Sequence, residues 1–338
     1  MKLITVSYNE AGQRLDKLLA KYLTEAPKSF LYKMMRKKNI TLNNKKAQGN
    51  EILTQGDEIK LFLADDTIDK FSSKSQPVKP KIKTALDQKV TLNVLYEDSD
   101  VLLVNKPAGM LSQKANPEDL SLNEYILAYL MNTGAVNDKI LESFRPSICN
   151  RLDRNTSGIV AAGKTLPGTQ GLSTLFHDRT MKKYYLAIVC GKLTKAEHIS
   201  GYLTKDEKTN KVSISKTQTP DSAAIETEYR PLASNDYVTL LEVHLITGRT
   251  HQIRAHLSSI GHPIIGDYKY GQAKKNEYFK KNYKIRSQML HAWRMEFPKC
   301  TGALKGLSDK TIMAELPNTM KKILEGEKLK WEPGTPEA

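Results

Sequence analysis

The chain has 338 residues, of which 39% are hydrophobic and 26% are charged. These fractions lie near globular averages and exclude a fibrous or wholly disordered protein, while the length predicts two domains rather than one. Lys and Arg number 52 against 37 Asp and Glu, which gives a formal net charge of +15 at pH 7. Such an excess is typical of proteins that bind a polyanion, although generically basic proteins share it.

The start of the chain and its cysteines restrict the expected compartment and metal chemistry. The opening residues contain no apolar targeting core, and no run of about 18 apolar residues occurs in the sequence. We therefore expect a cytoplasmic protein with no membrane partner. Cys149, Cys190 and Cys300 are odd in number and form no C-x-x-C pair, which predicts reduced structural thiols and no zinc ribbon.

Residues 1–68 are predicted to form a small first domain. Apolar side chains at helical spacing predict helices over 15–23 and 30–34, and short strands are expected at 40–42 and 58–63. A run of positive charge lies on or just after the second helix and comprises Lys33, Arg36, Lys37 and Lys38. Such a run is usually a solvated helix face. Its position at a helix end beside a strand turn nevertheless favours contact with RNA phosphates.

The rest of the chain reads as a linker, a large domain and a tail. Residues 69–88 are rich in Ser, Lys and Pro without an apolar period, which predicts a basic linker. Residues 89–325 mix strands and helices in an order that favours an α+β domain. Residues 326–338 are predicted to be a flexible tail.

Several elements of the large domain can be predicted locally. Ser121 and Glu124 form a capping-box pattern that starts a helix. Strands are expected at 89–97, 101–106, 184–189 and 237–246, and a helix at 250–260. In that helix Ile253, Leu257 and Ile260 form the apolar stripe, which leaves His251 and Arg254 on another face.

Asp153 lies in a polar, turn-prone segment just before the apolar residues 159–162. An isolated Asp in such a loop is usually a turn or cap residue. The flanking Arg151 and Arg154 keep its carboxylate ionised, so that it could serve as a nucleophile or as an ion-pair partner. The loop residues alone leave both roles open.

Residues 150–158 resemble the signature loop of the RluA-type RNA pseudouridine synthases, which usually reads His-Arg-Leu-Asp-x-x-Thr-Ser-Gly. Asn150 stands where that family usually has His, which affects loop contacts or target choice rather than the reaction. The first 65 residues or so resemble the alpha-L RNA-binding domain of ribosomal protein S-four. Further segments resemble the synthases in the family's order: 105–110, 182–187, 247–257, 261–267 and 290–292.

The resemblance implies an α+β catalytic domain, with a mixed and mostly antiparallel sheet, that isomerises uridine in RNA to pseudouridine. By family analogy the expected substrate is large-subunit ribosomal RNA. The isomerisation needs no redox change and no external energy, so we expect neither a metal nor a nucleotide cofactor. We expect a monomer whose partner is RNA.

The resemblance also implies roles for individual residues. Asp153 would be the catalytic carboxylate, Tyr185 the ring beside the uracil, and Arg249 the cation that pairs with Asp153. Tyr184 competes with Tyr185, because adjacent strand residues face opposite sides and only one can enter the site. Tyr185 is preferred since it directly precedes Leu-Ala, as in the family. Arg151 would fill the stack that the extruded base vacates, or hold the flanking phosphate.

Two other functions compete with this interpretation. Residues 158–165 match the phosphate-binding pattern G-x-x-x-x-G-K-[ST], which would make Lys164 a nucleotide ligand. The intervening Ile-Val-Ala-Ala reads as strand, however, and Pro167 and Gly168 follow where the motif needs a helix. The other rival is a ribosome-associated RNA binder without catalysis, in which Asp153 would be dispensable.

Overall fold

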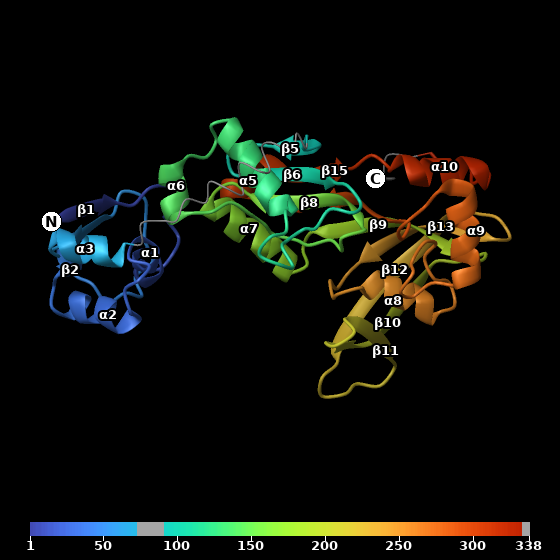
Figure 1. The fold of residues 1–338 in the computed structure, drawn as a ribbon, viewed down its shortest axis with the longest axis horizontal. Helices are drawn as coiled ribbons and strands as arrows, with labels where there is room; N and C mark the ends of the chain where they lie inside the picture. The colour runs from blue at the N-terminus through green and yellow to red at the C-terminus, as the bar shows by residue number, and fades with distance from the viewer. Residues whose placement is uncertain (73–90, 333–338) are drawn as a thin grey trace.

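A computed structural model describes residues 1–72 and 91–332 (Figure 1). The chain begins with a small unit that contains a four-stranded antiparallel sheet in the order β1-β4-β2-β3. Its strands are β1 (Lys2–Thr5), β2 (Ile40–Leu42), β3 (Lys45–Lys46) and β4 (Glu58–Leu61). Its helices are α1 (Leu15–Tyr22), α2 (Lys28–Arg36) and α3 (Asp65–Phe71).

Helices α1 and α2 of this unit form because each presents one apolar stripe to the core that it shares with the strands. In α1, the side chains Leu15, Leu18 and Leu19 are fully buried at the i, i+3, i+4 spacing of one helix face. The two predicted helices are thereby confirmed. Helix α3 was not predicted, and it crosses the expected domain boundary at residue 68. The Phe71 ring lies 4.6 Å from the Phe30 ring, centroid to centroid, so the start of the expected linker belongs to the first unit. Residues 73–88 of that linker lie outside the described residues.

The large unit is built on an eleven-stranded sheet whose main path is β11-β10-β12-β13-β9-β14-β8-β6-β5. Among the described strands, β14 pairs with β8 in parallel and the other pairings are antiparallel. The expected α+β fold with a mixed, mostly antiparallel sheet is confirmed. The strands are β5 (Val94–Glu97), β6 (Val101–Lys106), β7 (Ser147–Ile148), β8 (Ser157–Gly163), β9 (Lys182–Cys190), β10 (Glu197–Asp206), β11 (Lys211–Ser215), β12 (Ala223–Ser234), β13 (Val238–Leu245), β14 (Leu290–Glu296) and β15 (Thr311–Met313).

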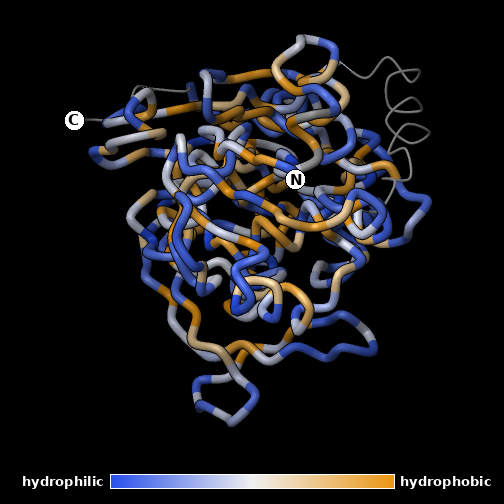
Figure 2. Tube along the Cα trace, turned by 90° about the vertical axis from the view of Figure 1, so that its left-hand side faces the viewer, coloured by the Kyte–Doolittle hydropathy of each residue, from blue (hydrophilic) through white to orange (hydrophobic). Residues whose placement is uncertain are grey.

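Helices cover both faces of this sheet near β6 and β8. Successive residues of a strand point to opposite faces, and here both sets are buried. Leu102 and Val104 join the core beneath α5, whereas Val101 and Leu103 join the core beneath α7. Figure 2 shows hydrophobic segments concentrated in the interior and hydrophilic segments along the outer loops. The helices are α5 (Leu122–Asn132), α6 (Asp138–Ser143), α7 (Leu166–His177), α8 (Gln252–Ser259), α9 (Ala273–Tyr283), the 3₁₀ turn η1 (Gly302–Leu307) and α10 (Asn318–Gly326).

The capping box at the start of α5 is present as predicted. The Glu124 carboxylate accepts from the Ser121 backbone N–H at 3.0 Å and from its hydroxyl at 2.7 Å. This pair satisfies donors that would otherwise be orphaned at a buried helix end.

The apparent phosphate-binding motif is a strand followed by a helix. Residues 159–162 belong to β8, where they pair with β6 and cannot wrap a phosphate. The expectation that no helix follows was wrong. Helix α7 begins directly after Thr165, whose hydroxyl accepts from Gly168 N–H at 3.1 Å, and Pro167 is tolerated in the first turn. The Lys164 ammonium donates to Glu97 at 2.7 Å, so the geometry excludes a nucleotide-binding loop here.

The expected flexible tail is packed as far as residue 332. Leu329 is buried, the Trp331 ring lies 5.8 Å from the Trp293 ring, and Glu327 accepts from the Tyr283 hydroxyl at 2.7 Å. The prediction is wrong for this stretch because two apolar side chains, Leu329 and Trp331, pack against the core of the large unit. Residues 333–338 lie outside the described residues.

Three further features of the described residues bear on the predicted chemistry. Cys149, Cys190 and Cys300 are free thiols. No helix among residues 1–72 and 91–332 combines the length and apolarity that a membrane span requires. Within the same ranges, no three His, Cys, Asp or Glu side chains gather closely enough to hold a metal ion.

Candidate active site

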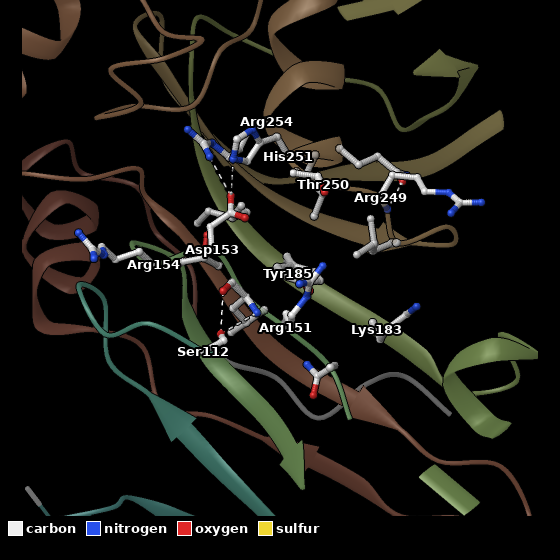
Figure 3. Close-up of a pocket in the computed structure, with 18 of the residues that line it drawn as sticks. Ser112, Arg151, Asp153, Arg154, Lys183, Tyr185, Arg249, Thr250, His251 and Arg254 are labelled. Atoms are coloured by element: carbon white, nitrogen blue, oxygen red, sulfur yellow. Dashed lines mark hydrogen bonds and ion pairs between the residues drawn. The ribbon is translucent and has the colours of Figure 1, made fainter. Parts of the chain in front are cut away.

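A cleft of about 1080 Å³ opens on the large unit beside the loop between β7 and β8. Asp153, Tyr185, Arg151 and Arg249 all line it, so the structure brings these four predicted residues to one place (Figure 3). The other predicted site residues lie elsewhere, exposed on or just after α2 of the first unit: Lys33, Arg36, Lys37 and Lys38.

The backbone of the loop that carries Asp153 is held by hydrogen bonds from the side chains of Ser112 and Lys106. The Ser112 hydroxyl donates to Leu152 C=O at 2.7 Å and accepts from Leu152 N–H at 3.0 Å. The Lys106 ammonium donates to the carbonyls of Pro107, Met110 and Arg154 at 3.0, 2.8 and 3.1 Å. Asp153 therefore sits on a loop whose backbone is tied to two buried side chains.

Lys106 is fully buried, and the sequence indicates it only as part of the motif at residues 105–110. Burial lowers the pKa of Lys106 to about 7, while the negative charge of Asp153 acts in the opposite direction. A buried lysine whose three donor protons all find carbonyl acceptors is a structural tie for the loop.

The cation that pairs with Asp153 is Arg254, and the prediction of Arg249 was wrong. Arg254 Nη1 lies 2.8 Å from Asp153 Oδ2. Arg249 is exposed and extends away from the carboxylate on another wall of the cleft (Figure 3). The reason is the chain path, because the helix opens three residues after Arg249 and its inward face carries Arg254.

A second carboxylate orients Arg254. Asp267, which is fully buried, accepts from Arg254 Nε at 2.7 Å and from Nη2 at 3.0 Å. Burial works against the charge of Arg254, but the hydrogen bonds and negative charges of Asp267 and Asp153 raise its pKa overall. The guanidinium thus stays charged and in one orientation, which fixes the place of the Asp153 oxygen.

His251 is the other group close to Asp153. Its Nε2 lies 3.8 Å from Asp153 Oδ2, and its Nδ1 lies 3.0 Å from the Tyr270 hydroxyl. The residue adopts the left-handed conformation with φ of 55°, which is costly for a side chain of this size. Burial lowers the pKa of His251, with Asp153 opposing that effect. The ring packs beside the carboxylate, and its burial disfavours the charged form.

Tyr185 and not Tyr184 lines the cleft, as the alternation of strand residues requires. Burial, together with the charge of Asp153, raises the pKa of Tyr185 above the usual range for tyrosine. Tyr184 lies on the opposite face of β9, where its ring stacks on His244 at 4.8 Å and on the Arg294 guanidinium at 3.9 Å.

Asn150, the departure from the family pattern, bonds the backbone of β8. Its side-chain amide donates to Ile159 C=O at 3.2 Å and its carbonyl accepts from Ala161 N–H at 2.8 Å. The amide continues the pairing of β7 with β8 at the start of the Asp153 loop. Arg151, one residue further on, is exposed at the mouth of the cleft.

Known proteins resemble this chain along most of its length. Residues 100–259 match a family model described as RNA pseudouridylate synthase. The ribosomal large subunit pseudouridine synthase C of Pasteurella multocida is 30% identical over 332 residues, which covers 96% of this chain and 93% of that protein. The chain belongs to the RNA pseudouridylate synthase family.

Other relatives of this synthase are similarly distant and cover most of the chain. The synthase C of Vibrio cholerae is 28% identical over 88% of this chain and 89% of its own length, and the synthase D of Nitrosomonas europaea is 30% identical over 87% and 79%. Among solved structures, human RNA Pseudouridylate Synthase Domain Containing 4 superposes with a TM-score of 0.58 at 21% identity. It covers 74% of this chain and 96% of its own, which supports the fold.

Sequence reasoning missed Arg254, Asp267, Lys106 and His251 as parts of the site. The sequence did contain a signal for Arg254. This residue lies outside the apolar stripe of its helix, and it belongs to the family-like motif at residues 247–257. Asp267 ends another such motif. Nothing local indicated that the two side chains meet, since that contact depends on how the chain folds back after α8.

Proposed function

We propose that this synthase isomerises uridines of ribosomal RNA, with large-subunit RNA as the substrate, and that Asp153 is the catalytic carboxylate. The single observation that carries the proposal is the position of Asp153. Its carboxylate is held by Arg254 in the cleft of about 1080 Å³, beside the inward-facing Tyr185. The names of the relatives support the choice of RNA.

The reaction breaks the bond from C1′ to N1 of the uridine and joins C1′ to C5 after the base has turned. An ionised carboxylate can attack the sugar or the base, or it can stabilise charge while the glycosidic bond breaks. Arg254 supports each of these roles, because the ion pair at 2.8 Å fixes the direction in which the Asp153 carboxylate faces the cleft.

The target uridine must leave its helix to reach Asp153, because the reacting atoms are inaccessible in a stack. Extrusion costs a few kcal/mol. Arg151, exposed at the mouth of the cleft, is placed to fill the vacated stack or to hold a flanking phosphate. The exposed cations of α2 supply a second RNA contact at a distance from the cleft.

The proposal is tested by incubating the full chain with unmodified large-subunit and small-subunit ribosomal RNA and mapping pseudouridine at single-nucleotide resolution. Asp153→Asn keeps the shape of the side chain and removes its charge, and Asp236→Asn is the control at an exposed carboxylate. We expect product at defined large-subunit positions from wild type and control, and none from Asp153→Asn.

Equal product from Asp153→Asn and wild type would show that Asp153 is dispensable. Product on small-subunit RNA alone would contradict the proposed substrate. No product on either RNA, with binding retained, would favour the non-catalytic RNA binder.

A further inference from the structure

Lys183 is a buried cation that faces the cleft and has no partner in the described part of the chain. The side chain is 9% exposed, and it lies two residues before Tyr185 on the same face of β9 (Figure 3). Its ammonium makes no hydrogen bond or ion pair with any residue among 1–72 and 91–332. The stem of Lys183 is buried, whereas its ammonium opens into the cleft, where a ligand from outside the chain can reach it. A cation in such a partly enclosed place attracts an anion more strongly than a cation in open water does.

The surroundings of Lys183 make its charge more costly. Burial lowers the pKa of Lys183, and the positive charge of Arg179 lowers it further. Arg179 lies in the turn between α7 and β9 with a left-handed φ of 59°, exposed and lining the same cleft. Two cations are therefore held near each other, one of them strained and one of them buried.

The cleft offers them no free negative charge. Asp153 is the single carboxylate among the described residues that line it, against eight Lys and Arg side chains. Arg254 already neutralises Asp153 at 2.8 Å. An anion from outside the chain is thus the missing partner. A phosphodiester suits this place, because RNA carries one at each nucleotide and Lys binds phosphate as a point charge.

We propose that Lys183 and Arg179 form a subsite for a backbone phosphate next to the extruded uridine. The inference rests on the proposed function in that it takes RNA as the ligand of the cleft. The Lys183 ammonium and the Arg179 guanidinium approach the same phosphate, which holds the nucleotide chain while Asp153 reacts with the uridine. This subsite binds and positions the RNA, and it takes no part in bond breaking.

The test measures the affinity of the full chain for unmodified large-subunit RNA as a function of KCl concentration. Lys183→Met removes the charge and keeps a long apolar stem. Lys182→Met is the matched control, because Lys182 is adjacent on β9 but exposed on the other side of the strand. Lys183→Arg keeps the charge.

We expect Lys183→Met to weaken binding about tenfold or more at low salt, and to reduce the slope of log affinity against log salt by about one. Its KM for RNA should rise with little change in kcat. Lys182→Met should match wild type, and Lys183→Arg should restore most of the affinity. The melting temperature of Lys183→Met should be equal to or above that of wild type, since the variant removes an unpaired charge from a largely buried side chain.

Unchanged affinity and an unchanged salt slope in Lys183→Met would overturn the subsite. A lower melting temperature with no change in KM would also overturn it, because Lys183 would then be a structural residue. If wild type forms pseudouridine while Lys183→Met binds normally, the subsite is wrong and the proposed function stands. If wild type forms none, the proposed function fails, and the salt slopes still decide the subsite.

Discussion

Arg254 is shared by two carboxylates, with Nη1 2.8 Å from Asp153 and the other guanidinium nitrogens 2.7 and 3.0 Å from Asp267. Asp267 is fully buried, whereas the Asp153 side chain keeps 29% of its exposure. The buried carboxylate therefore orients the arginine, and the arginine orients the carboxylate that faces the cleft. A chain of contacts of this kind transmits the rigidity of the core to a loop.

The two arginines of the α8 region should have separable effects. Arg254→Lys keeps a positive charge but cannot span both carboxylates, so we expect kcat to fall about 100-fold through misplacement of Asp153. Arg249→Lys should leave kcat close to wild type, because Arg249 does not contact the carboxylate. Single-turnover rates with excess enzyme measure this difference. A larger loss of kcat in Arg249→Lys than in Arg254→Lys would contradict the assignment.

Tyr185 should act as a neutral phenol. Burial raises the pKa of its hydroxyl above the ordinary value of about 10, so the phenolate is not populated at neutral pH. We expect Tyr185→Phe to lower kcat without changing the shape of its pH profile between pH 6 and about 10. A wild-type rate that rises toward pH 10, with the rise absent in Tyr185→Phe, would instead identify the phenolate as a base.

Two buried histidines should make folding sensitive to acid. Burial lowers the pKa of both His291 and His256 to about 4, against about 6.5 for an exposed histidine. Between pH 4 and pH 6.5 the two histidines are protonated in the unfolded chain but stay neutral in the folded chain. The stability is therefore complete above pH 6.5 and is lost as the pH falls toward 4, by on the order of 3 kcal/mol for each residue.

Urea unfolding at pH 7.5 and pH 5 measures this loss. His291→Gln should show a smaller difference between the two pH values than wild type, because one of the two titrating groups is gone. His177→Gln is the control, since its side chain is 88% exposed. An equal pH dependence in wild type and His291→Gln would count against the assignment.

Gly158 should be irreplaceable where β8 meets β14. Its φ is 115°, and an added Cβ would lie 2.1 Å from the Ala292 carbonyl oxygen. We expect Gly158→Ala to cost about 3 kcal/mol or more in the free energy of unfolding, from backbone strain and overlap together. Gly56→Ala is a matched control, because Gly56 has φ of 91° with open space around it, and should cost about 1 to 2 kcal/mol. Similar costs for the two variants in urea titrations would contradict the close approach.

The cations on and just after α2 should contribute to RNA affinity through charge alone. Replacing Lys33, Arg36, Lys37 and Lys38 by Gln should flatten the salt dependence of RNA binding by about one for each phosphate that these side chains neutralise. Single-turnover kcat at saturating enzyme should not change. The control replaces exposed lysines of α9 and α10, at the other end of the molecule (Figure 1): Lys280, Lys281, Lys321 and Lys322. An equal effect of the two sets would indicate a nonspecific influence of net charge.

Features that depend on neighbouring residues could be predicted from the amino-acid sequence. Leucine spacing predicted α1, the Ser121 and Glu124 pair predicted the start of α5, and strand alternation directed Tyr185 and Tyr184 to opposite faces. The motifs around Asp153 were sufficient to indicate the family. Helix periodicity, capping and strand alternation act over a few residues, so each can be read from the chain directly.

Which arginine meets Asp153 depends instead on the folded domain, because the two partners are 101 residues apart. The left-handed turn at His251 leaves Arg249 exposed and brings Arg254 between two carboxylates. The same reason explains why α3, the packed residues before 333 and the buried Lys183 were not foreseen. Each depends on a surface supplied by a distant part of the chain, and the free energy of such a contact is decided by the packing of the whole domain rather than by local preference.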